Sequence, residues 1–282
     1  MRGQGSPIRA VRVLRFRDGK GSQARDALAV EEPLEVRVAW REEGRRRSEP
    51  FSVTMRTPGD DFELVAGLLL GEGVVRSAAE LQEITYCRSG EGTQDYNVVE
   101  ARLASGVTFD AERMRRNLYA TSSCGICGRA SLEGAELLGC GPVGGDDVRV
   151  SPETLLRLPD VLYEDQGTFH RTGGLHAAGL FPLAGEGKEL REDVGRHNAV
   201  DKVLGHALLQ GRVPAADRIL VVSGRLSFEI VQKAVMAGVP VLVAVGAPSS
   251  LAVELAERSR QTLVGFVRQG GFNVYSAPER IG

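Results

Sequence analysis

The sequence predicts an α/β protein with two domains, and three observations support this fold class. Residues 218–275 alternate apolar strands with helices in the order βαβαβ. Residues 31–115 place short strands around one apolar helix, which is typical of a small α+β domain. A chain of 282 residues is long for one hydrophobic core and sufficient for two. We expect a basic N-terminal arm at 1–30, the small domain at 31–115, and a cysteine loop plus the larger α/β domain at 116–282.

The composition argues against binding to nucleic acid or membranes. Lys and Arg total 35 against 37 Asp and Glu, for a net charge of −2, so no general attraction to nucleic acid is expected. The basic segment 1–20 has no apolar run that could form the core of a signal peptide. The longest apolar runs, Leu64–Leu70 and Val239–Val245, are too short to span a bilayer. We expect a cytosolic protein, whose thiols are kept reduced.

The small domain is predicted from period-two alternation and turn residues. Residues 1–30 lack periodicity and predict a mobile arm or an edge strand. Asp60 follows a Pro-Gly turn and can cap a helix whose apolar positions lie within 62–69. Strands are expected at 33–40, 51–55, 84–87 and 96–103, the first two forming a hairpin.

The segment Thr121–Gly128 contains two of the four cysteines, Cys124 and Cys127, separated by two residues. This spacing allows metal ligation, dithiol exchange, or carriage of sulfur as a persulfide. Neighbouring serines and glycines provide hydroxyl and backbone N–H donors, which would lower the pKa of a nearby thiol. The segment therefore predicts an accessible, nucleophilic thiolate.

Other residues bear on the choice among these chemistries. A zinc site could recruit Cys87 and Cys140, but the second close cysteine pair of a zinc ribbon is missing. A thioredoxin-type site lacks its surrounding βαβ unit. A zinc deaminase needs Glu two residues after its His, whereas His176 is followed there by Ala178, and the cysteine pair is preceded by Ser123 rather than Pro. Sulfur transfer requires only the thiolate on a mobile loop, and zinc remains the alternative.

Two segments that follow carry histidines. Ser151 and a following Pro predict a helix that ends near Leu158. His170 and His176 lie in a Gly-rich stretch that leads into an apolar strand. Each could act as an acid, base or ligand, but a histidine in such a turn more often has a structural hydrogen bond.

Residues 192–203 form the densest polar cluster in the chain. Helical spacing places His197 and Asp201 on one face, and Asn198 and Lys202 on the neighbouring face. Such a helix start can bind a phosphate or a polar ring. The alternative is a capped, salt-bridged surface helix, and the number of bonding groups favours a binding site.

The C-terminal strands end in loops suited to anions. The loops Ser223–Arg225 and Gly246–Ser250 each follow a buried parallel strand and precede a helix. Such positions bind phosphates in α/β sheets, although neither loop matches a P-loop or a dinucleotide-binding fingerprint. A nucleotide-like ligand is therefore expected at these loops.

Taken together and in order, the motifs resemble the formate dehydrogenase accessory sulfurtransferase family (FdhD). They are Met55–Asp61 with Gly71–Gly73, Ser123–Gly128, Thr172–His176, Glu192–Lys202 and Ser223–Arg225. The resemblance covers the chain from about residue 30 to its end. Any single motif is weak evidence, whereas the ordered set is specific.

The resemblance implies a sulfurtransferase that accepts sulfane sulfur from a cysteine desulfurase. It would deliver this sulfur to the molybdenum bis-molybdopterin guanine dinucleotide cofactor of formate dehydrogenase. Cys124 would form the persulfide and Cys127 would be its partner in the relay. The expected cofactor-binding residues are Phe266, Val267, Arg268, Gln269, Gly270 and Gly271 from the resemblance, with Ser223, Gly224, Arg225, His197 and Asn198 from the patterns above.

The resemblance also implies a larger domain similar to the cytidine-deaminase fold, a homodimer, and no metal held by the protein itself. A guanine nucleotide would mimic part of the cofactor. Two alternatives remain at this point. One is a zinc-stabilised binding module, and the other is a chaperone for a guanine-nucleotide cofactor that performs no sulfur chemistry.

Overall fold

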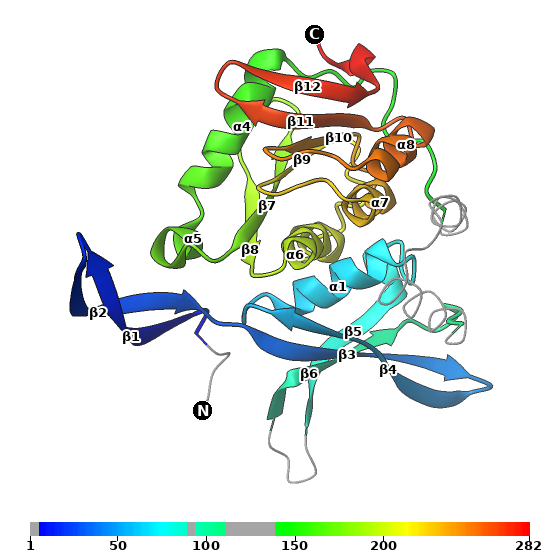
Figure 1. Ribbon diagram of the computed structural model, residues 1–282. Coiled ribbons are helices and arrows are strands. Elements are labelled where there is room, and N and C mark those ends of the chain that lie inside the picture. The colour runs from blue at the N-terminus through cyan, green and yellow to red at the C-terminus, as the bar shows by residue number, and fades with distance from the viewer. Residues whose placement is uncertain (1–5, 89–93, 111–138) are drawn as a thin grey trace.

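A computed structural model describes residues 6–88, 94–110 and 139–282. Within these ranges it contains three β-sheets and six α-helices, a mixed α/β architecture as predicted (Figure 1). The strands are β1 (Ile8–Arg17), β2 (Lys20–Ala29), β3 (Glu32–Glu42), β4 (Arg45–Arg56), β5 (Leu81–Arg88), β6 (Gln94–Leu103), β7 (His176–Pro182), β8 (Glu189–Asp193), β9 (Arg218–Val222), β10 (Val241–Ala244), β11 (Thr262–Arg268) and β12 (Gly271–Ser276). The helices are α1 (Asp61–Gly71), α4 (Pro152–Glu164), α5 (Gly167–Thr172), α6 (Arg196–Leu209), α7 (Phe228–Met236) and α8 (Ser250–Arg258).

The four-stranded sheet has the order β4-β3-β6-β5, and the predicted hairpin is confirmed as β3 and β4. Leu34, Val36 and Val38 alternate along β3 and are fully buried, since successive side chains of a strand point to opposite faces. Helix α1 lies on this sheet (Figure 1). Asp60 occupies the predicted N-cap position, but its φ of 56° is left-handed and its side chain makes no capping hydrogen bond.

The six-stranded sheet has the order β12-β11-β10-β9-β7-β8 and contains the predicted βαβαβ succession. Strands β9, β10 and β11 are parallel, whereas β7 and β12 run antiparallel to their neighbours β9 and β11. Both faces are buried: Leu220 and Leu242 belong to one core, and Ile219 and Val241 to a second core that includes residues of α4. Burial on both faces explains the continuous apolar runs of these strands.

Helix α6 lies between the two larger sheets and packs closely on α1 (Figure 1). The close approach depends on two glycines. A Cβ on Gly67 would lie 2.6 Å from the carbonyl carbon of Asp201, and a Cβ on Gly205 would lie 2.5 Å from the backbone nitrogen of Gly67. The surface-helix alternative for this segment is wrong, because α6 is buried along most of its length.

The N-terminal segment forms a two-stranded hairpin, where we expected a mobile arm or an edge strand. Strands β1 and β2 pair antiparallel from Ile8 to Ala29, and β2 contacts α5. Leu14 and Phe16 are 58% and 67% exposed, and neither strand has a fully buried residue. The apolar–polar alternation that marks a strand with one buried face is therefore weak here. The domain boundary near 115 stays a prediction, because it falls outside the described residues.

The segment before β7 differs from the prediction in two ways. Ser151 caps α4 as expected, accepting a hydrogen bond from Thr154 N at 3.1 Å, but the helix continues to Glu164 rather than ending near Leu158. His170 lies on the short helix α5 rather than in a turn. The six residues of α5 are too few to give a readable helical period.

Candidate functional site

One edge of the six-stranded sheet gathers most of the predicted site residues. Strands β8, β9, β10 and β11 all run in the same direction, so their carboxyl ends and the start of β7 lie together. We call this region the carboxyl edge. It includes the loops Ser223–Arg225 and Gly246–Ser249 and the β11–β12 turn.

Backbone hydrogen bonds join the loops of the carboxyl edge to one another. Gly246 N donates to Gly224 O at 3.2 Å, and Phe266 N donates to Gly246 O at 3.2 Å. A Cβ on Gly246 would lie 2.7 Å from Gly224 O, so only glycine permits this contact. The loops therefore form one continuous backbone surface.

The start of α6 is fixed at this edge by a buried carboxylate, Asp193. It accepts hydrogen bonds from Gly195 N at 2.8 Å and Thr57 N at 3.1 Å, and it forms an ion pair with Lys202 at 2.8 Å. Asp193 and Lys202 are 0% and 1% exposed. Because this network joins the β4–α1 loop, β8 and α6, it sets where the first residues of α6 lie.

Two histidines and one arginine flank the loop after β9. A Cβ on Gly224 would lie 3.6 Å from His176 Nδ1 and 3.8 Å from Arg196 Cδ. His197 Nε2 lies 3.0 Å from Ser227 Oγ and 3.8 Å from Glu229 Oε2. Within the described residues Arg196 Nε is buried without a hydrogen-bond partner. A ligand oxygen at this edge could accept that N–H.

Both histidines are held in the neutral form near neutral pH. Burial lowers the pKa of His197 to about 4, with further lowering by the charges of Arg196 and Lys233. Burial and Arg196 also lower the pKa of His176, against an opposing effect of Asp193. Of these three neighbouring side chains, only Arg196 is therefore positively charged near neutral pH.

The predicted binding residues divide into those at the surface of the edge and those away from it. Arg225, Phe266 and the turn residues Arg268, Gln269, Gly270 and Gly271 are exposed, and Ser223, Gly224 and His197 are half-buried. Val267 is buried, so only its backbone could reach a ligand. Phe266 has a φ of 56° at an irregular point of the β11–β12 register.

Asn198 lies away from the surface of the edge. Its amide donates to Met55 O at 2.8 Å and Asp193 Oδ1 at 3.1 Å, and its oxygen accepts from Thr54 Oγ1 at 3.2 Å. It therefore joins α6 to β4. Asp201, expected on the same face as His197, instead forms a buried ion pair with Lys233 at 2.7 Å.

Cys124 and Cys127 lie outside the described residues. Of the cysteines considered for zinc, Cys140 packs against the core, and burial raises the pKa of its thiol to about 12. Within the described ranges, no group of three or more His, Cys, Asp and Glu side chains could hold a metal ion. His170 Nε2 lies 2.8 Å from Tyr163 O, a structural contact.

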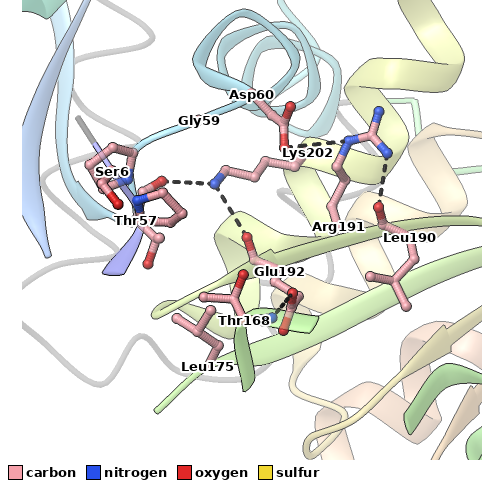
Figure 2. Close-up of a pocket in the computed structure, with 12 residues that line it drawn as sticks. Ser6, Thr57, Gly59, Asp60, Thr168, Leu175, Leu190, Arg191, Glu192 and Lys202 are labelled. Atoms are coloured by element: carbon pink, nitrogen blue, oxygen red, sulfur yellow. Dashed lines mark hydrogen bonds and ion pairs between the residues drawn. The ribbon is translucent and has the colours of Figure 1, made fainter. Parts of the chain in front are cut away.

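The motif at 57–60 lines a cavity of about 630 Å³ between the β4–α1 loop, β8 and α5 (Figure 2). The polar side chains that line this cavity form hydrogen bonds and ion pairs with other side chains and with the backbone. Lys202 Nζ also donates to Thr57 O at 2.9 Å, and Glu192 accepts from Thr168 N at 2.9 Å. Arg191 pairs with Glu63 at 2.5 Å. These contacts stabilise the junction of the sheets and leave the carboxyl edge as the better candidate site.

Comparison with known proteins places the chain in a family. The model of the FdhD/NarQ family matches residues 29–282. The chain belongs to the FdhD/NarQ family. A relative from Streptomyces avermitilis named sulfur carrier protein FdhD is 52% identical over 275 residues, covering 96% of this chain and 94% of that protein. A relative of the same name from Sulfolobus acidocaldarius is 42% identical, covering 97% and 98%.

A solved structure shares the FdhD/NarQ fold found here. The crystal structure of a protein from Desulfotalea psychrophila, assigned as a formate dehydrogenase accessory protein, aligns with a TM-score of 0.73 and 26% identity. The alignment covers 98% of this chain and 100% of that one. In the part of this FdhD/NarQ chain that is described, no helix is both long and apolar enough to cross a bilayer.

Proposed function

We propose that this chain is a sulfur carrier that acts as a sulfurtransferase in the maturation of formate dehydrogenase. The observation that carries the proposal is the 52% identity, over 96% of the chain, to a protein named sulfur carrier protein FdhD. The cysteine pair at 124 and 127 supplies the chemistry, and the carboxyl edge supplies a surface for the substrate.

The proposed first step moves one sulfur atom between two proteins. The Cys124 thiolate attacks the terminal sulfur of a persulfide on a cysteine desulfurase. A new S–S bond forms on Cys124, the old one breaks, and the desulfurase cysteine leaves as a thiolate. Cys124 then carries the persulfide, with no net oxidation.

In the proposed second step the sulfur is released to the substrate, the molybdenum bis-molybdopterin guanine dinucleotide cofactor. The Cys127 thiolate attacks Cys124 Sγ, a disulfide forms, and the outer sulfur leaves as hydrosulfide for the molybdenum. A cellular dithiol must then supply two electrons to reduce the disulfide. This order gives each cysteine a distinct role.

The carboxyl edge suits the phosphates of such a substrate. Backbone loops at the ends of parallel strands can bind phosphates, and Arg225 and Arg268 add exposed positive charge there. The buried, unpartnered Nε of Arg196 offers a further donor. These residues, with His197, Ser223, Gly224 and the turn at 266–271, form the proposed cofactor site, and a guanine nucleotide would occupy part of it.

The test is to incubate the protein with a desulfurase and cysteine and to analyse the peptide containing residue 124 by mass spectrometry. We expect the mass of one added sulfur atom on Cys124. The Cys124→Ala variant should neither load sulfur nor activate formate dehydrogenase, whereas Cys140→Ala, which changes a thiol packed against the core, should load normally. Full activation by Cys124→Ala would contradict the proposal.

Two alternatives predict different results, the first in a metal analysis of the purified protein and the second in the activation assay. Stoichiometric zinc bound through all four cysteines would favour a zinc-stabilised module. Intact function after replacement of both Cys124 and Cys127 would favour a cofactor chaperone without sulfur chemistry.

We infer further that the protein acts in the cytosol, as a homodimer, with a larger domain of cytidine-deaminase type. The mixed sheet with a parallel β9-β10-β11 centre supports the last inference. The reducing conditions of the cytosol suit a persulfide carrier, which needs free thiolates.

A further inference from the structure

The hairpin of β1 and β2 is the element that the proposed function leaves without a role. Residues 8–28 precede the part of the chain that the family model matches. The hairpin projects beyond α5, which β2 contacts, and away from the rest of the described chain (Figure 1). Asp18 and Gly19 have φ of 50° and 75°, as in a two-residue type I′ turn. Because a lone two-stranded hairpin is marginally stable in water, its surface points to a further partner.

One edge of the hairpin presents unpaired backbone groups. Val30 N donates to Pro7 O at 2.9 Å, and the register continues without a shift from Ile8 to the turn. Odd-numbered residues of β1 therefore exchange hydrogen bonds with β2, and even-numbered residues point their N–H and C=O groups outward. Within the described residues, these outward groups have no partner at Ala10, Arg12, Leu14 and Phe16.

The hairpin places like charges directly opposite one another. Between Ile8 and Ala29, six basic side chains stand against two acidic ones. Arg12 lies opposite Arg25, and Arg17 lies opposite Lys20, an arrangement that destabilises a two-stranded pair. One of the six basic groups forms an ion pair in the described chain, at 3.9 Å. A local arrangement that costs stability is expected where a site is built, and this one indicates an anionic partner.

The arginine pair shares its face with exposed apolar side chains. Side chains two residues apart on a strand point to the same face, so Leu14 and Phe16 follow Arg12 toward the tip. Both apolar side chains are exposed. The ring of Phe16 lies over Gly21, where an added Cβ would be 3.2 Å from Phe16 Cε1. This face therefore combines two cations with an apolar end.

We propose that the hairpin binds an extended acidic segment of a partner protein, which adds as a third strand along β1. A carboxylate of the segment lies opposite Arg12, within reach of Arg25, and apolar side chains lie opposite Leu14 and Phe16. A polypeptide fits better than a lipid or a nucleic acid, because the outward C=O groups of β1 need N–H donors and phosphates only accept hydrogen bonds. The inference goes beyond the proposed function and does not depend on sulfur chemistry at Cys124.

The test measures binding of the full-length protein to a labelled peptide by fluorescence anisotropy. The peptide Glu-Val-Glu-Val-Val-Glu-Val-Ala-Glu, laid antiparallel to β1, places Glu opposite Arg12 and Val opposite Leu14 and Phe16. We expect binding that weakens as salt rises. The double variant Arg12→Gln, Arg25→Gln should bind about tenfold more weakly, since two exposed ion pairs contribute about 1 kcal/mol or less each. Because this variant removes a like-charge pair, it does not weaken the hairpin itself.

Two controls separate strand addition from simple attraction of charges. The double variant Arg41→Gln, Arg45→Gln makes the same change in net charge on the β3–β4 hairpin, at two exposed arginines, and should bind like the wild type. A peptide with Pro in place of the fourth and seventh residues keeps all its carboxylates but loses two N–H groups. It should bind several-fold more weakly than the first peptide.

Four results would overturn the inference. They are no binding of the first peptide to the wild type, unchanged affinity in Arg12→Gln, Arg25→Gln, equal binding of both peptides, and equal loss in the control variant. Sedimentation with vesicles of phosphatidylcholine and phosphatidylglycerol tests a lipid partner, and light scattering tests a second copy of the chain. Without peptide binding, an effect of Arg12→Gln, Arg25→Gln on vesicle binding would assign the face to lipid, and an effect on molecular mass would assign it to a second copy.

Discussion

Replacing Gly205 by alanine should destabilise the whole protein, because this glycine lets α6 touch the backbone of α1. A Cβ at 205 would lie 2.5 Å from Gly67 N and 2.8 Å from the carbonyl carbon of Glu63, whereas ordinary contacts begin at 3.4 Å. The carbonyl oxygen of Glu63 would lie closer still, so the helices would have to separate by more than about 1 Å. All three obstacles are backbone atoms, so no side-chain rotation can relieve them.

The expected change in the free energy of unfolding follows from two opposing effects. Overpacking of a tight core costs about 3 kcal/mol at the upper end of its range. Alanine in place of glycine within a helix returns about 1 kcal/mol. We therefore expect the free energy of unfolding of Gly205→Ala to fall by about 2 kcal/mol.

Urea denaturation followed by circular dichroism measures this change. Gly167→Ala is the matched control, since Gly167 lies in α5 and has no atom within 4 Å of an added Cβ. It should change the free energy of unfolding by no more than about 0.5 kcal/mol. A Gly205→Ala protein as stable as the wild type would refute the close-packing argument.

Two further predictions concern buried charges near α6. Lys233→Met leaves Asp201 buried without its cation and should lower the free energy of unfolding by about 3–5 kcal/mol. Adding Asp201→Leu to this variant should recover much of the loss. Additive losses of the two substitutions in urea denaturation would contradict this prediction. His197 should titrate near pH 4 by NMR, and Arg196→Gln should raise its pKa because a nearby positive charge is removed. Because the folded state disfavours protonation of His197, the stability that the neutral imidazole contributes is lost as the pH falls from about 6.5 toward 4. An unchanged pKa of His197 in Arg196→Gln would refute the role of the Arg196 charge.

The sequence predicts the strand-rich parts of the fold well because their signals are local. Continuous apolar runs identify β9, β10 and β11, and period-two alternation identifies β3. The start of α4 follows from Ser151 and the proline after it. In each case the information lies within a few neighbouring residues.

Helix α6 is harder to predict because its polar residues suggest an exposed surface. Asn198, Asp201 and Lys202 are all buried, each with partners from distant parts of the chain. Asn198 bonds to Met55 O, 143 residues away. Spacing along one helix cannot reveal partners on another element.

The candidate site shows the same limit. The anion-suited loops can be located from sequence, because parallel strands bring their carboxyl ends together. Arg196 gives no such signal, since a single arginine at the start of a helix is ordinary. Only the fold, which buries its Nε without a hydrogen-bond partner among the described residues, distinguishes it from other arginines.

The hairpin of β1 and β2 makes the tendency of the protein to aggregate depend on ionic strength. In the described part of the chain these strands pair only with each other, so their outer edges are open to strand addition by a neighbouring molecule. The hairpin compensates with charge, since Arg9, Arg12, Arg15 and Arg17 lie along β1. Mutual repulsion between such hairpins is screened within about 8 Å at physiological salt and over shorter distances as salt rises. Concentrated salt therefore removes the protection against aggregation that these arginines provide.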